Sequence, residues 1–334
     1  MKIFDSFLFF QELDLLEIRL KYLNDSVDYF IILENFRTFT GIEKGFLFEK
    51  NIKRFEKYSD KIIYFKLDNL MTSYLSLKTH LVDSQNLVDK KIHTFLESHN
   101  HYPKNNFNWV TEAYSREALH HMYAQHIKED DIVMFSDLDE IPSLDFIKAI
   151  KKNFSSKSPI NFYVAEHIEF KYFLNLMAPY PWLGTVAGRY RHISKFSLNT
   201  LRLDSKSKKQ YVSKINIKNK GFHFSGCGGE KLLLSKIEGG GHQELNFPYM
   251  KKNIFKRICA GYDSFSLSPG KSLKYVDINT TNLYGSKLRP ILLAYEHLLI
   301  KNLSKLNFFD YLQILFLQVL IFFKRASNKL SSLL

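Results

Sequence analysis

The sequence predicts an α/β fold with a mainly parallel, doubly wound central sheet and a C-terminal helical extension. Short apolar runs alternate with amphipathic segments through the first half of the chain, and parallel strands need a crossover helix between them. The 334 residues are 45% hydrophobic and 15% aromatic, which suffices for a large core and excludes a disordered chain. We expect one domain over residues 1–300 and an apolar helix over 301–334.

The first half of the chain has the clearer pattern. Two predicted strands, 3–10 and 28–33, enclose a helix whose leucines 13, 16, 20 and 23 share one face. The alternation continues with a helix-like stretch, a strand, a long helix and a buried strand at 50–58, 62–67, 108–128 and 132–135.

The second half is less regular. Strands are predicted at 161–170 and 184–190, and the weakly periodic stretch 73–106 is expected to hold a helix and a mobile loop. Residues 202–220 include seven Lys or Arg and one Asp, which predicts a solvated basic loop or hairpin.

The net charge of +13, from 47 Lys and Arg against 34 Asp and Glu, indicates an anionic partner. A phosphorylated substrate or an acidic membrane surface fits this charge, whereas no RNA- or DNA-binding signature is present, so no nucleic acid is expected. The two cysteines, Cys227 and Cys259, are too few for a disulfide scaffold and fit a reducing compartment.

Two carboxylates, Asp137 and Asp139, follow the buried strand 132–135, and Pro142 then stops its continuation. Open α/β sheets bind ligands at such strand ends. An Asp-x-Asp there can hold Mn²⁺ or Mg²⁺, which in turn neutralises a diphosphate. The alternative is structural, with Asp137 capping a turn and Asp139 starting the next helix.

A second candidate segment runs from Gly221 to Lys231. It places His223 between two phenylalanines, then three glycines within four residues, then the lysine. His223 can complete the metal site and Lys231 can contact phosphate, while the alternative is a tight turn with a buried histidine. The later cluster 239–244 is either another active-site loop or a flexible connection.

The charge-free run at 311–323 is followed by Lys324 and Arg325. Thirteen residues are too few to span a bilayer, which takes about 20. The run therefore predicts either a helix lying in the membrane interface or a terminal helix packed on the core. We expect a cytoplasmic protein without an export signal, attached peripherally to the inner face of the cell membrane.

Linked motifs across residues 3–280 resemble glycosyltransferase family 17, the β-1,4-mannosyl-glycoprotein 4-β-N-acetylglucosaminyltransferases. They lie at 5–20, 27–41, 60–63, 116, 130–142, 221–225 and 231–244. The resemblance implies a GT-A-like fold and inverting transfer of N-acetylglucosamine from a UDP donor. It also implies that Asp137 and Asp139 bind the metal and the diphosphate.

The family usually has Trp where Phe222 stands and a bulky apolar residue near Cys227, and these departures leave the metal site intact but bear on the preference for donor and acceptor. Animal members of the family have an N-terminal membrane anchor, whereas this sequence starts directly at the first strand, so we expect a microbial, cytosol-facing member. Its acceptor would be a glycan or glycolipid other than the protein N-glycans of animal members.

Inversion requires a base that takes the proton of the acceptor hydroxyl, and Glu230 and Glu244 are candidates because both lie in glycine-rich segments. Arg116 is expected to reach the diphosphate, with a surface ion pair as the alternative. Glu34, which follows the second strand, is expected to contact the nucleoside of the donor or to cap a helix.

Two other classes compete with a transferase. A phosphatase-like, metal-dependent hydrolase also uses an Asp-x-Asp after a buried strand, although usually after the first strand. A non-catalytic basic binding module fits the net charge but leaves the paired aspartates and the His-Gly-Gly-Lys segment without a role.

Overall fold

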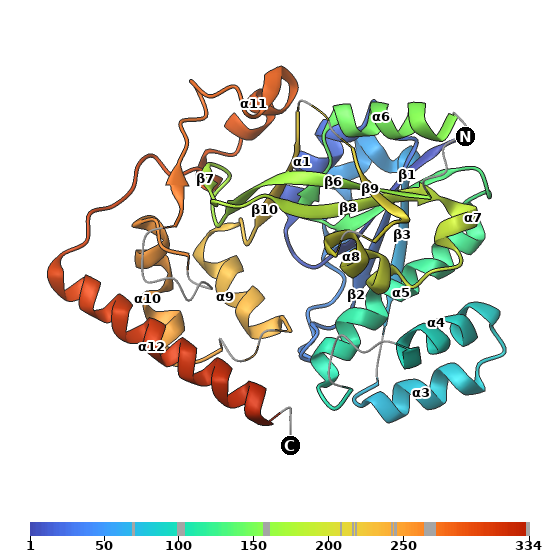
Figure 1. Ribbon diagram of the computed structural model, residues 1–334, viewed down its shortest axis with the longest axis horizontal. Helices are drawn as coiled ribbons and strands as arrows, with labels where there is room; N and C mark the ends of the chain where they lie inside the picture. The colour runs from blue at the N-terminus through green and yellow to red at the C-terminus, as the bar shows by residue number, and fades with distance from the viewer. Residues whose placement is uncertain are drawn as a thin grey trace. The chain divides into compact units, whose positions relative to one another are not determined.

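The computed structural model describes residues 1–68, 71–98, 104–155, 161–207, 209–215, 217, 219–241, 243, 246–263 and 272–331. The chain forms two compact units (Figure 1), and each is described by itself. Unit 1 comprises Met1–His167 and Trp182–His223, and unit 2 comprises Ile168–Pro181 and Phe224–Leu334.

The centre of unit 1 is a parallel array in the order β4-β1-β2-β3. Its apolar strands are the four that the sequence predicts, and they are confirmed as β1 (Ile3–Phe9), β2 (Tyr29–Asn35), β3 (Ile62–Leu67) and β4 (Ile132–Asp137). Helix α1 (Leu13–Leu23) crosses from β1 to β2, as its leucine spacing predicts. Since the neighbouring strands run parallel, their carboxyl ends meet at one edge, where Asp137 ends β4.

The other half of the unit 1 sheet is mainly antiparallel. Strand β8 (Trp182–Arg189) pairs antiparallel with both β4 and β6 (Phe162–Lys171). The sheet is therefore mixed, and the prediction of a mainly parallel sheet is wrong. Only ten residues separate β6 from β8, whereas a parallel crossover takes a dozen or more, so β8 can only return antiparallel.

Helix α5 (Phe107–His126) packs on the parallel strands and contacts α4 (Leu87–Ser98) and α8 (Leu198–Lys206). The stretch 73–106, predicted as one helix and a loop, contains two helices, α3 (Tyr74–Asp83) and α4 (Leu87–Ser98). The remaining elements of unit 1 are α2 (Leu47–Lys50), the 3-10 helix η1 (Ile52–Lys61), β5 (Glu140–Ile141), α6 (Leu144–Ser155), α7 (Tyr190–Ile193), α8 (Leu198–Lys206), β9 (Val212–Lys214) and β10 (Gly221–Ser225), which ends in unit 2.

Unit 2 is mainly helical around its own apolar core. Its elements are β7 (Leu176–Met177), α9 (Gly229–Gly239), α10 (Pro248–Cys259), β11 (Lys274–Tyr275), α11 (Gly285–Leu293), the 3-10 helix η3 (Glu296–Leu298) and α12 (Phe308–Ser331). None of the helices in the described ranges has the length and apolarity needed to cross a membrane.

Candidate functional site

The two aspartates lie on a turn that a buried arginine holds closed. Asp137 ends β4, Leu138 and Asp139 form the turn, and Glu140 begins β5. From α1, Nη1 of Arg19 donates to the main-chain carbonyls of residues 137, 138 and 140 at 2.9, 2.9 and 3.0 Å. One guanidinium therefore sets the path of the backbone that presents both carboxylates.

Arg19 is itself fixed by Asp5 on β1. Its Nε and Nη2 donate to the two carboxylate oxygens at 2.8 and 2.6 Å, and Nη2 also donates to Oγ of Ser136 at 2.8 Å. Neither Arg19 nor Asp5 is exposed, so each charge depends on the other. The sequence signal for this pair was an aspartate inside an apolar strand and an arginine on the apolar face of a helix.

Two further arginines converge on Asp137. Arg116 of α5 lies 3.3 Å from its carboxylate, and Nη2 of Arg202 from α8 donates to it at 2.9 Å. Arg202 is buried, so the predicted solvated basic segment 202–220 is wrong at its first residue. The number of basic residues in a segment does not show which of them is buried in an ion pair with a carboxylate. The Asp137 side chain keeps 33% exposure and so faces solvent or a ligand.

The buried Glu140 is the second carboxylate that pairs with Arg202. Its oxygens accept from Arg202 at 2.7 and 3.0 Å and from Nε1 of Trp182 at 2.6 Å. Burial raises the pKa of Glu140, but the Arg202 guanidinium and, to a smaller extent, His223 and His167 outweigh it and hold the pKa far below its usual range. Glu140 is therefore an ionised structural anchor that orients Arg202.

Glu117, the residue after Arg116, determines where α8 begins. Its buried carboxylate accepts from the Ser197 hydroxyl at 2.6 Å and from the backbone N–H groups of Leu198 and Asn199 at 3.0 and 3.1 Å. A carboxylate is favourable at a helix N-terminus because the unpaired N–H groups there need acceptors. Helix α5 thus carries one arginine to Asp137 and fixes the helix that carries the other.

His223 lies beside Asp139, with 3.6 Å between Nε2 and Oδ1. Strand β10 places it opposite Glu140 of β5, and its ring packs on Trp182 with centroids 4.8 Å apart. A Cβ at Gly221 would lie 2.6 Å from the carbonyl oxygen of Ile141, so only glycine allows β10 to approach β5 this closely. The predicted neighbourhood of His223 and Asp139 is thus present in unit 1.

His167 on β6 supports the strand that carries His223. Its Nε2 accepts from the Thr185 N–H at 3.4 Å, so Nδ1 is the ring N–H and donates to the Phe222 carbonyl at 3.0 Å. Burial lowers the pKa of His167 to about 4, although the nearby Glu140 charge opposes this. The imidazole is therefore neutral near pH 7.

The donor set can be compared with what a divalent cation requires. No group of three or more His, Cys, Asp or Glu within the described ranges is arranged to hold a metal. Asp139 and His223 supply two ligand groups, and Asp137 lies two residues from Asp139 with its carboxylate already facing two arginines. Mg²⁺ commonly uses one or two carboxylates together with substrate phosphates and water. These residues therefore fit a cation shared with a phosphate.

Glu34 lies in the environment of the second of its two predicted roles, the capping of a helix. It is fully buried, and its oxygens accept from Lys44 Nζ and the Leu47 N–H at 2.6 Å, the Tyr64 hydroxyl at 2.7 Å and the Phe48 N–H at 3.0 Å. This is the helix-capping alternative, here at the start of α2. A contact with a nucleoside would require one of these bonds to break.

The remaining predicted residues belong to unit 2 or lie outside the described ranges. Glu230 and Lys231 are exposed in the first turn of α9. The glycines before them include Gly228 and Gly229 at φ 144° and 80°, so they serve the turn into α9. Glu244 lies outside the described residues. The roles of all three as base or phosphate contact stay predictions.

A cavity of about 210 Å³ adjoins the carboxyl end of β2 and the start of α5. Asn35, which ends β2, accepts from the Ser115 hydroxyl at 3.1 Å, and Ser115 precedes Arg116. The lining residues include the segment Thr38-Phe39-Thr40-Gly41 that contributes to the family resemblance, and they are Asn35, Arg37, Thr38, Phe39, Thr40, Gly41, Met71, Thr72, Phe107, Asn108 and Thr111.

Sequence comparison identifies the family of this chain. The family model described as "Glycosyltransferase family 17" matches residues 1–80 and 75–281. The chain belongs to glycosyltransferase family 17. The predictions of the family and of an enzyme that transfers a glycosyl group are therefore confirmed, and membership favours transfer over the hydrolase and the non-catalytic module.

This family-17 glycosyltransferase was also compared with curated proteins and with solved structures. No curated protein matches its sequence. Among solved structures, it is similar to the apo form of mouse xyloside xylosyltransferase 1, with 10% identity and a TM-score of 0.29 over 84% of this chain and 98% of that chain. Membership of the family implies, in general terms, a nucleotide-sugar donor and a glycan acceptor.

Proposed function

We propose that this family-17 glycosyltransferase inverts the donor sugar as it moves N-acetylglucosamine from UDP-N-acetylglucosamine to a hydroxyl of a glycan or glycolipid. The observation that carries the proposal is the grouping of Asp137 with Arg116 and Arg202, beside the Asp139–His223 pair. Anion-binding cations next to a partial metal-ligand set suit a diphosphate leaving group.

The chemistry assigns a role to each side chain of this group. Negative charge develops on the β-phosphate as the glycosidic bond breaks, so cations placed there stabilise the transition state more than the ground state. Arg116 and Arg202 would turn from Asp137 towards the diphosphate. Asp139 and His223, with Asp137, would hold Mn²⁺ or Mg²⁺, which acts as a Lewis acid on the phosphate oxygens.

The cavity at the start of α5 is proposed to take the nucleoside. Its volume of about 210 Å³ is below the roughly 300–1,000 Å³ of sites that enclose whole ligands, so it suits one end of the donor. Phe39 and Phe107 among its lining residues offer apolar surface to a base, and Asn35 and Asn108 offer amide groups to its polar edge. The diphosphate would then extend along α5 towards Arg116.

The test begins with donor turnover by the full chain, measured as release of the nucleoside diphosphate from a panel of nucleotide sugars with Mn²⁺, Mg²⁺ or a chelator. Asp139→Asn and His223→Gln should each lower turnover by about 100-fold or more, with unchanged unfolding midpoints. Asp130→Asn is the matched control, because that aspartate is 68% exposed in a surface pair.

Two outcomes would contradict distinct parts of the proposal. Full turnover in excess chelator would contradict the role of a divalent cation but would leave the proposed glycosyl transfer standing. Turnover of another nucleotide sugar in place of UDP-N-acetylglucosamine would replace the donor. Acceptor identity is then read from transfer of labelled sugar to glycan and glycolipid fractions.

A further inference from the structure

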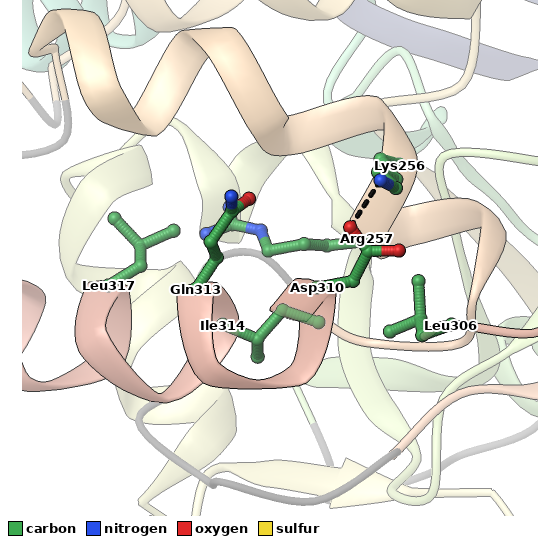
Figure 2. Close-up of a pocket in the computed structure, with 7 residues that line it drawn as sticks. All are labelled: Lys256, Arg257, Leu306, Asp310, Gln313, Ile314 and Leu317. Atoms are coloured by element: carbon green, nitrogen blue, oxygen red, sulfur yellow. Dashed lines mark hydrogen bonds and ion pairs between the residues drawn. The ribbon is translucent and has the colours of Figure 1, made fainter. Parts of the chain in front are cut away.

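Helix α12 is attached to unit 2 by one side only. Ile314, Leu317 and Ile321 are buried and share that side. Figure 2 shows the start of this contact, where Asp310 pairs with Lys256 of α10 and Ile314 lies one turn further along. The alternative of a terminal helix packed on the core therefore describes this side of the helix.

The opposite side of α12 is also apolar, yet it is exposed. At about 100° per residue, its large side chains fall within an arc of roughly 160°, centred opposite the buried side. An ordinary surface helix presents polar residues there. The exposed side chains, with fractional exposures from 43% to 73%, are Phe308, Phe309, Tyr311, Leu312, Phe316, Val319, Phe322 and Phe323.

The sequence around α12 is strongly basic. In residues 301–334 the basic residues are Lys301 and Lys305 before the helix and Lys324, Arg325 and Lys329 near its end. The single acid of that segment, Asp310, is paired with Lys256 on the buried side. A second copy of the chain docked on this face would bring like charges together, whereas an anionic lipid surface is complementary.

We propose that the exposed face of α12 docks on an anionic lipid bilayer, with the helix lying in the plane of the interface. Phenylalanine and leucine on one face with basic residues at the end are typical of interfacial helices. Over its described residues, the helix does not combine the length and the apolarity needed to span the bilayer. This inference concerns a surface of unit 2 and holds whichever donor and acceptor the enzyme uses.

The experiment is co-sedimentation of the full chain with vesicles of phosphatidylcholine alone or with 30% phosphatidylglycerol, a composition chosen near that of anionic membranes. The wild type should bind the anionic vesicles. The triple variant Phe309→Gln/Val319→Gln/Phe323→Gln should bind them with an affinity that is lower by a factor of about ten or more. Glutamine keeps helix propensity, and the three positions avoid the buried side. The matched control, Leu75→Gln/Leu87→Gln, replaces equally exposed leucines of unit 1 and should bind as wild type.

A second variant keeps the test decisive if the triple variant misfolds. Lys324→Gln/Arg325→Gln should weaken binding to anionic vesicles and leave any binding to neutral vesicles unchanged. Wild type remaining in solution with anionic vesicles would overturn the proposal. Equal binding by the wild type and the folded triple variant would also overturn it. A third contradicting outcome is a wild-type dimer that forms without vesicles and is lost in the triple variant, since a second copy would then cover the face.

Discussion

Arg19 and Asp5 form a two-point ion pair with N–O distances of 2.6 and 2.8 Å, and neither side chain reaches solvent. The same guanidinium closes the turn that presents Asp137 and Asp139. A single buried cation thus supports both the core between β1 and α1 and the geometry of the candidate site.

Replacing Arg19 with methionine should lower the free energy of unfolding by about 3–5 kcal/mol, because Asp5 would remain as an uncompensated buried charge. Urea unfolding at pH 7 measures the loss. Arg54→Met, which removes an exposed pairing with Asp14 and Glu17, should cost no more than about 1 kcal/mol. Equal losses in the two variants would show that the Arg19 pair does not stabilise the core.

Arg202→Gln should change how stability depends on acid. In the wild type the depressed pKa of Glu140 means that the folded state binds fewer protons than the unfolded state, so stability falls as the pH drops below about 4.3. Without Arg202 the pKa of Glu140 rises, and this part of the acid slope should shrink. Unfolding free energies from pH 3 to pH 7 compare the slopes, and parallel curves for both proteins would refute the assignment.

His167 should make the protein less stable between pH 6.5 and pH 4. Its pKa is lowered to about 4 in the folded state, against about 6.5 when unfolded, so protons favour the unfolded chain in this window by up to about 3 kcal/mol. His120, whose pKa burial lowers to about 3, adds to the same trend. His167→Gln should flatten the profile, and a profile as steep as that of the wild type would contradict the assignment.

Gly221→Ala should disturb the candidate metal site through the backbone. The added methyl group would press on the Ile141 carbonyl, displace β10 and move His223 away from Asp139. We expect a loss of about 1–3 kcal/mol in stability and weaker Mn²⁺ binding by titration calorimetry. Gly285→Ala, where a methyl group meets nothing within 4 Å but φ is 65°, should lose stability without any change in Mn²⁺ affinity.

The parallel strands and the turn at Asp137 could be predicted because each depends on a local pattern. Apolar runs of strand length indicate β1 to β4, and a proline after two aspartates indicates that no strand continues past that point. The antiparallel half could not be predicted in the same way. Strand β8 is equally apolar in either orientation, and only the short connection from β6 limits its direction.

Most of the charged residues that support the site could not be identified from the sequence. Glu117 and Ser197 are 80 residues apart, and Arg202 lies at the start of a basic segment that resembles an exposed loop. Their roles depend on pairing between distant helices, which periodicity and composition do not report. Asp139 and His223 were found because each lies in a distinctive local motif, although only folding brings them within 3.6 Å.

Helix α5 also fixes the spacing between the two parts of the proposed donor site. Thr111 lines the cavity and Arg116 meets Asp137, and five residues of helix separate them by about 7.5 Å along the axis. Because the helix is rigid, this spacing does not change with the donor that binds. With the nucleoside in the cavity, the phosphates of the donor would have to cover this fixed distance to reach Arg116, so the helix would favour donors of matching length before any contact with the sugar.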